Sequence, residues 1–539
     1  MKRILLFTLL FISAAAFSQE DAWVYFNAKA DVETYLANPL TMLSQRALDR
    51  RTNQNIGLDF KDVPIDESYI TLVGNQPGIT VMAKSKWLNA IHVRGAVADI
   101  QALSALAFVA SLDFADDSLD SSSGGRSAYQ NRNTAVNKNL DIQANFNYGN
   151  SNNQIEMLNG HLLHQQDYTG AGKIIAVIDA GFPSVNTVQP FQRLFDNNLI
   201  LGGYNFVSRN NDFYSANPHG TAVLSTMGGY TNNALVGTAP DAAYYLFITE
   251  DSAAENPVEE SLWVEAAETA DSLGVDVINT SLGYFLYDNP AYSYTYEDMT
   301  GTKSFISRGA DIAFSRGMVV VVAAGNSGDT VNPYVGSPGD AINVLTVGAV
   351  DATEQYVSFS SIGPSFDGRI KPDVMAKGLA ATLSDSSGTI TTANGTSFAS
   401  PIMAGMVASL WQALPEKTNS EIVELIKQSA NFYANPNAQY GYGIPDFSLA
   451  LSNGLSVKDN DKNEFLIYPN PVESQLSFIF PSAILNAEIT FYNVLGQEIM
   501  IKSVSVQNPS ISVSGLNAGI YWYKINALNF SQSGKLLKK

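Results

Sequence analysis

Residues 173–181 read KIIAVIDAG, an apolar run that ends on a carboxylate, Asp179. A strand that is apolar on both of its faces is typical of a parallel sheet covered by helices on both sides. In an open sheet of this kind, ligands collect outside the carboxyl ends of the strands. Asp179 is therefore well placed to orient an imidazole, although a turn or a helix N-cap would also account for it.

The chain on both sides of this run alternates between strand-like and helix-like segments, from about residue 150 to residue 454. The strand-like runs are residues 243–249, 274–282, 318–325 and 343–350, and the helix-like segments are residues 260–273, 306–316 and 400–414. This alternation predicts an α/β fold with a largely parallel sheet flanked by helices.

The regions before and after this alternation have other patterns. The N-terminal region predicts a small α+β unit, with helices at residues 39–51 and 97–106 and strands at residues 79–83, 90–93 and 108–113. After residue 464, short strands separated by turn signals predict a small all-β sandwich domain.

His219 is the best candidate for a general base among the four histidines of the chain. It lies in NPHGTAVLS, where Gly220 permits the close approach of another segment. His92 lies in the N-terminal region, and His161 and His164 are spaced i, i+3 on a predicted helix. That pair would suit a metal ion, but no third ligand is nearby in the sequence, so a pair on the surface is favoured.

Ser397 and Asn326 complete a set of side chains suited to acyl transfer. Ser397, in NGTSFASP, begins a long apolar helix, whose first N–H groups are free to bind developing negative charge. Asn326 follows the apolar strand at 318–325, and its amide is a possible donor to an oxyanion. A simple N-cap serine and an Asn-Ser-Gly turn are the alternatives for the two residues taken singly.

Taken together, four segments resemble the motif set of the subtilases, in the same order of Asp, His, Asn and Ser. They are IIAVIDAG, HGTAVLS, VVAAGNSG and NGTSFASP, supported by GTAPDA, INTSLG and FSSIGPSFDGRIKPDVMAKG. The resemblance extends from about residue 150 to residue 450. It implies a subtilisin-like fold and a serine endopeptidase that acts through an acyl-enzyme, with Asp179, His219 and Ser397 as the catalytic triad and Asn326 in the oxyanion hole.

The resemblance also implies how protein or peptide substrates are held. An extended substrate would pair with one strand edge and place the side chain before the scissile bond in a pocket of small residues, which leaves room for an apolar or aromatic group. The edge residues are Ser281, Leu282 and Gly283, and the pocket residues are Ala323, Ala324 and Gly325. The tyrosine-rich segment that follows, residues 284–306, either overhangs this cleft or packs on the surface, and packing is favoured.

Two positions depart from the family pattern. Ala180 stands where subtilases usually have Thr or Ser, and Ala222 stands where many have a second His. Neither is a triad position, but Ala180 predicts the loss of one hydrogen bond near Asp179. An inactive subtilase-like binding protein at the cell surface is the alternative function, and the complete set of catalytic residues argues against it.

The remaining segments predict the route of the protein out of the cell. Lys2 and Arg3 precede an apolar run of residues 4–17, which is typical of a signal peptide, here residues 1–18. A pro-segment is expected at 19–130, the peptidase domain at 131–455 and a linker at 456–464. By analogy with other subtilases, the pro-segment is expected to cap the cleft and to be removed by self-cleavage between Asp116 and Asn133.

Residues 465–539 resemble the C-terminal sorting domain of proteins exported by the type nine secretion system of Bacteroidetes. The motif YPNP at 468–471, the stretches ITFYNVLGQEI and LNAGIYWYKI, and the basic tail are the basis for this resemblance. It implies the secretion machinery as a partner, and a product that is secreted or attached to the outer cell surface. A carbohydrate- or protein-binding β-sandwich is the alternative.

Composition argues against several other classes of function. The net charge is −20, which disfavours nucleic-acid binding, and the absence of cysteine excludes thiol proteases and disulfides. No run in the expected mature chain is long enough to cross a membrane. No metal ligand is assigned and no cofactor is required for the chemistry. A structural calcium ion is compatible with the family but has no assigned site, and a monomer is expected.

Overall fold

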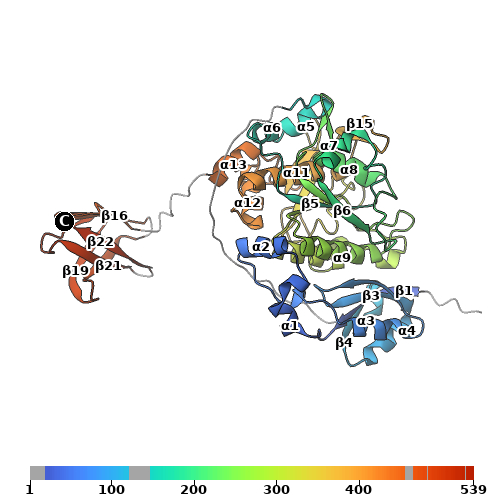
Figure 1. The fold of residues 1–539 in the computed structure, drawn as a ribbon, viewed down its shortest axis with the longest axis horizontal. Helices are drawn as coiled ribbons and strands as arrows, with labels where there is room; N and C mark the ends of the chain where they lie inside the picture. Colours follow the sequence, from blue (N-terminus) through green and yellow to red (C-terminus); the bar gives the residue numbers. More distant parts are fainter. Residues whose placement is uncertain (1–18, 121–145, 456–464, 482–483, 528–529) are drawn as a thin grey trace, which may run out of the picture. The chain divides into compact units, whose positions relative to one another are not determined.

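The computed structural model describes residues 19–120, 146–455, 465–481, 484–527 and 530–539 (Figure 1). The predicted signal peptide and the predicted linker lie outside these residues. The chain divides into two compact units, Met1–Gly454 and Leu455–Lys539, and each is described by itself.

The first unit is built on a seven-stranded parallel sheet, as the alternation of segments predicts. Its strands, in spatial order, are β13 (Val374–Lys377), β12 (Leu345–Val350), β11 (Val319–Ala323), β10 (Val277–Thr280), β5 (Ile174–Asp179), β9 (Ala243–Ile248) and β6 (Ile200–Asn205). β5 is the first strand of this sheet along the chain, and it lies inside the sheet because later strands pair with both of its edges. Its carboxyl end, at Asp179, is therefore at the topological switch point of the sheet.

The sheet is covered on both faces because its strands carry apolar side chains on both faces. Ile175 and Val177 pack on one side with α8 (His219–Gly228) and α11 (Thr396–Ala413). Ile174 and Ala176 pack on the other side with α9 (Val258–Leu273) and α10 (Phe305–Ser315). This alternation follows from the two-residue period of a strand.

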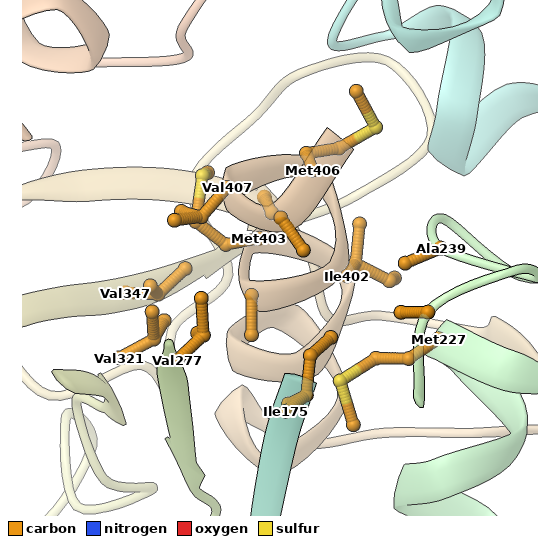
Figure 2. Close-up of a cluster of buried hydrophobic side chains, with 14 of the residues drawn as sticks. Ile175, Met227, Ala239, Val277, Val321, Val347, Ile402, Met403, Met406 and Val407 are labelled. Carbon is orange, nitrogen blue, oxygen red and sulfur yellow. The ribbon is translucent and has the colours of Figure 1, made fainter. Parts of the chain in front are cut away.

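α11 is the most deeply buried helix of this core. Figure 2 shows its side chains, among them Ile402, Met403 and Val407, surrounded by residues of the strands and of α8. Almost every residue from Thr396 to Trp411 is buried, as expected for a helix that is apolar all round. The rigid packing of α11 fixes the position of its first turn, which carries Ser397.

The N-terminal part of the same unit is a four-stranded antiparallel sheet packed against α9 (Figure 1). Its strands, in spatial order, are β2 (Thr80–Ser85), β3 (Ala90–Ala96), β1 (Gln19–Phe26) and β4 (Val109–Phe114). The two helices that cover its other face are α3 (Glu67–Gly74) and α4 (Val97–Ala102). The predicted α+β unit is confirmed, but its strand β1 and helix α3 were not predicted.

The predicted helix at residues 39–51 is wrong in its first half. A single 3₁₀ turn, Pro39–Thr41, comes first, and α2 (Gln45–Asn53) begins after it. Ser44 interrupts the pattern as an N-cap, since its side chain accepts a hydrogen bond from the Ala47 N–H. The backbone N–H of Ser44 donates instead to the carbonyl of Ser272, at the end of α9.

The second unit is a two-layer antiparallel sandwich, as predicted. One sheet has the order β16 (Leu466–Tyr468), β17 (Gln475–Ile479) and β20 (Ser510–Ser512). The other has the order β19 (Glu498–Ser505), β18 (Asn486–Tyr492), β21 (Gly519–Ala527) and β22 (Phe530–Lys538). Alternate residues such as Phe478, Phe491 and Ile525 form the core between the two sheets.

Candidate active site

Asp179 and His219 meet at the carboxyl end of β5. His219 is the first residue of α8, and its Nδ1 lies 2.8 Å from Asp179 Oδ1. Gly220 makes this approach possible, because a Cβ there would lie 2.5 Å from the Gly181 carbonyl and 3.0 Å from Asp179 Cβ. The sequence therefore places an imidazole against a carboxylate at the edge of the sheet.

The Asp179 carboxylate is buried, with 1% of its surface exposed. Oδ1 accepts hydrogen bonds from the Ala180 N–H at 2.7 Å and from His219. Among the described residues, no group donates to Oδ2, although that oxygen is also buried. Ala180 has no hydroxyl with which to donate to this oxygen.

The His219 imidazole is partly exposed, with 34% of its side chain accessible. The negative charge of Asp179 raises the pKa of His219 above its usual value, while burial acts in the opposite direction. A second acidic side chain, Glu250, contributes a smaller rise to this pKa. The site thus stabilises a protonated imidazole, as a general base requires after it has taken a proton.

Ser397 lies across from this pair, in the first turn of α11. Its hydroxyl donates to the carbonyl of Ser281 at 3.3 Å, and the Ser281 hydroxyl donates to the carbonyl of Ser397 at 2.9 Å. The next residue, Phe398, has its ring centroid 5.8 Å from that of His219. The first turn of α11 therefore lies beside His219, and in this conformation the Ser397 hydroxyl is bonded to the Ser281 carbonyl.

Asn326 is held by its side-chain oxygen, and no described residue is bonded to its amide nitrogen. Its Oδ1 accepts hydrogen bonds from the N–H and the hydroxyl of Thr396, at 2.9 and 3.0 Å. A Cβ built on Gly395 would lie 3.6 Å from Asn326 Nδ2 and 3.7 Å from the Ser397 nitrogen. Both donors therefore border one small space, which Gly395, with φ +149°, leaves open.

A cavity of about 270 Å³ opens beside Ser397 and Asn326. All six residues that the sequence assigned to substrate binding line it: Ser281, Leu282, Gly283, Ala323, Ala324 and Gly325. The structure adds Tyr284, Phe285 and Tyr334 to its wall. Tyr284 and Phe285 directly follow the predicted edge residues, whereas no sequence signal pointed to Tyr334.

The sequence profile of the subtilase family matches residues 170–443, which contain every residue of this site. The chain is a subtilase. Curated relatives agree with this match. The subtilase is 33% identical over 299 residues to "Subtilisin NAT" of Bacillus subtilis subsp. natto, with 55% of this chain and 70% of the relative covered. The identity to "Subtilisin" of Bacillus pumilus is also 33% over 299 residues, and 97% of that relative is covered.

The family and its relatives make this subtilase a serine peptidase. A solved structure, described as MycP1 with the N-terminal propeptide removed, is 24% identical, with a TM-score of 0.45 and coverage of 57% of this chain and 98% of that one.

The flanking regions of the subtilase match two further profiles. Residues 21–134 match the Peptidase S8 propeptide domain of Bacteroidota. Residues 466–539 match a secretion system C-terminal sorting domain, so the protein is directed to secretion. None of the helices in the described part of the chain is long and apolar enough to span a membrane.

The pro-segment of the subtilase is attached to α9 and α10 by buried polar contacts. Asp271, near the end of α9, is fully buried and pairs through one oxygen with Arg50 at 2.5 Å and through the other with Arg51 at 2.6 Å. His92 reaches Ser261 of α9 at 2.8 Å through Nδ1. His92 is therefore part of this interface.

The segment 284–306 is packed down onto the subtilase domain. Tyr287 and Tyr294 both donate to Glu260 Oε1, at 2.5 and 2.6 Å. Glu260 is fully buried in α9, so these bonds hold the segment against the core. The favoured prediction of packing is confirmed, and Tyr284 and Phe285 also reach the cavity.

The predicted surface pair of histidines is wrong for His164. His164 is fully buried and bonded to the Tyr148 hydroxyl at 2.9 Å and to the Thr238 carbonyl at 3.0 Å. Burial lowers the pKa of His164 to about 4, so the ring is neutral. Across the described ranges, no three His, Asp or Glu side chains are grouped to hold a metal ion.

Proposed function

We propose that this subtilase hydrolyses peptide bonds with Asp179, His219 and Ser397 as its triad and with Asn326 in the oxyanion hole. The 2.8 Å contact between His219 and Asp179, made beside the first turn of α11, is the observation that most supports this assignment. The order of these residues in the chain and their meeting at one edge of the sheet agree with the family match.

The first half of the reaction forms an acyl-enzyme. The Ser397 hydroxyl leaves the Ser281 carbonyl by rotating about its Cα–Cβ bond, and its oxygen attacks the scissile carbonyl carbon. His219 Nε2 takes the hydroxyl proton while Asp179 holds the ring through Nδ1. Asn326 Nδ2 and the Ser397 N–H donate to the oxyanion. The C–N bond then breaks as His219 gives the proton to the leaving amine.

The second half releases the acid product by the same groups. Water attacks the ester carbonyl, His219 accepts a proton from it, and the proton returns to Ser397 as the C–O bond to the enzyme breaks. No step needs a metal ion or a cofactor. A structural calcium ion stays a proposal without an assigned site, and we expect the enzyme to act as a monomer.

The cavity beside Ser397 supports a preference for apolar or aromatic side chains before the scissile bond. Ala323, Ala324 and Gly325 contribute little volume, which leaves a space of about 270 Å³. No Asp or Glu is among the described residues that line this space, so it lacks a partner for a Lys or Arg side chain. Digestion of a panel of peptides that showed strict cleavage after Lys or Arg would overturn this preference.

We further propose that the enzyme removes its own pro-segment, by a cut between Asp116 and Asn133. Residues 121–133 of that interval lie outside the described residues. Secretion of the Ser397→Ala variant in fully matured form, from cells that lack other proteases of this type, would contradict self-cleavage.

Labelling with a fluorophosphonate probe tests the central assignment. The purified mature enzyme is expected to bind the probe covalently and to digest casein, and the Ser397→Ala variant to do neither. A folded protein freed of its pro-segment that neither bound the probe nor digested casein would favour the alternative, an inactive binding protein.

A further inference from the structure

Two tyrosines from distant parts of the chain stack at the wall of the cavity. The ring centroids of Tyr296 and Tyr334 are 3.7 Å apart, with 20° between the ring planes. Tyr334 lines the cavity next to Ser397, whereas Tyr296 belongs to the packed segment 284–306 and is not part of the lining. One face of the Tyr334 ring is thus covered by Tyr296, and Tyr334 still contributes surface to the pocket.

The stack is held by contacts on both of its members. The backbone around Tyr334 pairs with Ile362, through a hydrogen bond from Val335 N–H to the Ile362 carbonyl at 2.9 Å. The Tyr296 hydroxyl donates to the Pro364 carbonyl at 2.9 Å, and the ring of Phe366 meets Tyr296 edge-on at 5.5 Å. These contacts restrict the motion of both rings, so Tyr334 presents a fixed aromatic surface.

We propose that Tyr334 determines specificity for an aromatic side chain before the scissile bond, and that Tyr296 is a positioning residue for it. This inference rests on the proposed function, because it assumes that the side chain enters this cavity. Ala323, Ala324 and Gly325 in the pocket wall fit any apolar group of suitable size, and the wall holds two further aromatic side chains besides Tyr334, those of Tyr284 and Phe285. A fixed tyrosine adds a geometric preference, since aromatic rings attract one another in stacked and edge-to-face arrangements.

The test measures discrimination between substrates in the mature enzyme. Peptide anilides that differ only in their last residue, Phe or Leu, give a ratio of kcat/KM values. Tyr334→Ala is expected to lower the Phe-to-Leu ratio about five-fold, the range expected for loss of one aromatic pair. Tyr334→Leu, which fills the space without a ring, is expected to act in the same direction and serves if the alanine variant fails to fold.

Tyr296 gives the second arm of the test. Tyr296→Ala is expected to lower the same ratio by about two-fold, because the Tyr334 ring loses its support. Tyr296→Phe keeps the ring and is expected to restore the ratio. Tyr433→Ala is the matched control, since Tyr433 is an exposed tyrosine outside the cavity.

The outcomes separate this inference from the proposed function. Active variants at position 334 that kept the wild-type ratio would overturn the role of Tyr334. A ratio that fell equally in Tyr296→Ala and Tyr296→Phe would overturn the positioning role of the Tyr296 ring. A wild-type enzyme that neither bound the fluorophosphonate nor cleaved either anilide would instead overturn the proposed function, and this inference with it.

Discussion

Asp179 and Asp271 are both buried carboxylates in the first unit, but their partners differ. Each oxygen of Asp271 meets an arginine guanidinium, from Arg50 and Arg51. Asp179 meets one imidazole and one backbone N–H through Oδ1, and no described group donates to its Oδ2. The carboxylate of Asp271, with both oxygens paired to arginines, links two parts of the chain. The carboxylate of Asp179, with one oxygen unpaired, keeps more of its charge to act on the His219 ring.

The largest expected effect comes from removing the charge of Asp179. Asp179→Asn keeps the shape of the side chain but leaves His219 in the wrong tautomer, so kcat is expected to fall on the order of 10⁴-fold. Active-site titration and initial rates on a peptide anilide measure this loss. A fall of less than ten-fold would mean that Asp179 does not support the base. The melting temperature should change little, because no buried cation is left without its partner.

Asp271→Asn is expected to lower the stability of the chain and to leave the rate of the mature enzyme nearly unchanged. In the Ser397→Ala chain, which is expected to keep its pro-segment, the change leaves two arginines short of a buried partner and should destabilise the chain by about 3 kcal/mol. Urea unfolding measures this difference. Asp241→Asn is the control, because its pair with Arg193 is partly exposed and is worth at most about 1 kcal/mol.

The activity of the mature enzyme completes this comparison. Asp271 lies near the end of α9 and is not among the residues of the candidate site, so mature Asp271→Asn is expected to keep the kcat of the wild type within about two-fold. A large loss of kcat in correctly titrated mature enzyme would show that the two carboxylates are not functionally separate.

The pH dependence of the rate gives a smaller and sharper comparison. In the proposed mechanism, His219 must be neutral to accept the Ser397 proton, so kcat/KM is expected to fall as the pH drops through the pKa of His219. Because Asp179 raises this pKa, the acid limb is expected to have its midpoint above 6.5. The residual activity of Asp179→Asn should show a lower midpoint. Burial raises the pKa of Glu250 to about 8, so this side chain is largely neutral in the acid limb and Glu250→Gln is expected to leave the midpoint nearly unchanged.

The smallest expected effect comes from completing the bonding of Asp179. The hydroxyl introduced by Ala180→Ser is expected to donate to Oδ2 and to stabilise the fold by about 1 kcal/mol. The added bond spreads the negative charge, so the acid limb of kcat/KM should move to lower pH by less than about one unit. Ala180→Gly, which adds no hydroxyl, is the control, and equal shifts in both variants would refute the explanation.

The sequence was sufficient for the parts of the site that are set by local pattern. Asp179 ends an apolar strand and Ser397 begins an apolar helix, so the sheet architecture alone brings them to one edge. The stack of Tyr296 on Tyr334 could not be predicted, because it depends on how a packed segment folds back over the pocket wall. His164 was misplaced for a similar reason, since its partners Tyr148 and Thr238 come from other segments.

The pro-segment was predicted as a unit, but its attachment was not. Ser44 and Arg50 read as ordinary residues of a helix, and their partners are supplied by the ends of α9 and α10. The spacing of apolar residues indicates which face of a helix is apolar, so it cannot reveal a buried ion pair of this kind.

α2 of the pro-segment caps the ends of two helices of the catalytic domain. Arg46 donates to the Gly274 carbonyl, and Gln54 donates to the Gly317 carbonyl, where α9 and α10 turn toward β10 and β11. In the proposed maturation, the enzyme loses these donors when the pro-segment is removed. The full chain therefore has donors that hold the turns after α9 and α10 in place, and the mature chain lacks these donors. Thermal unfolding is therefore expected to be reversible for the full chain and to show hysteresis for the mature chain.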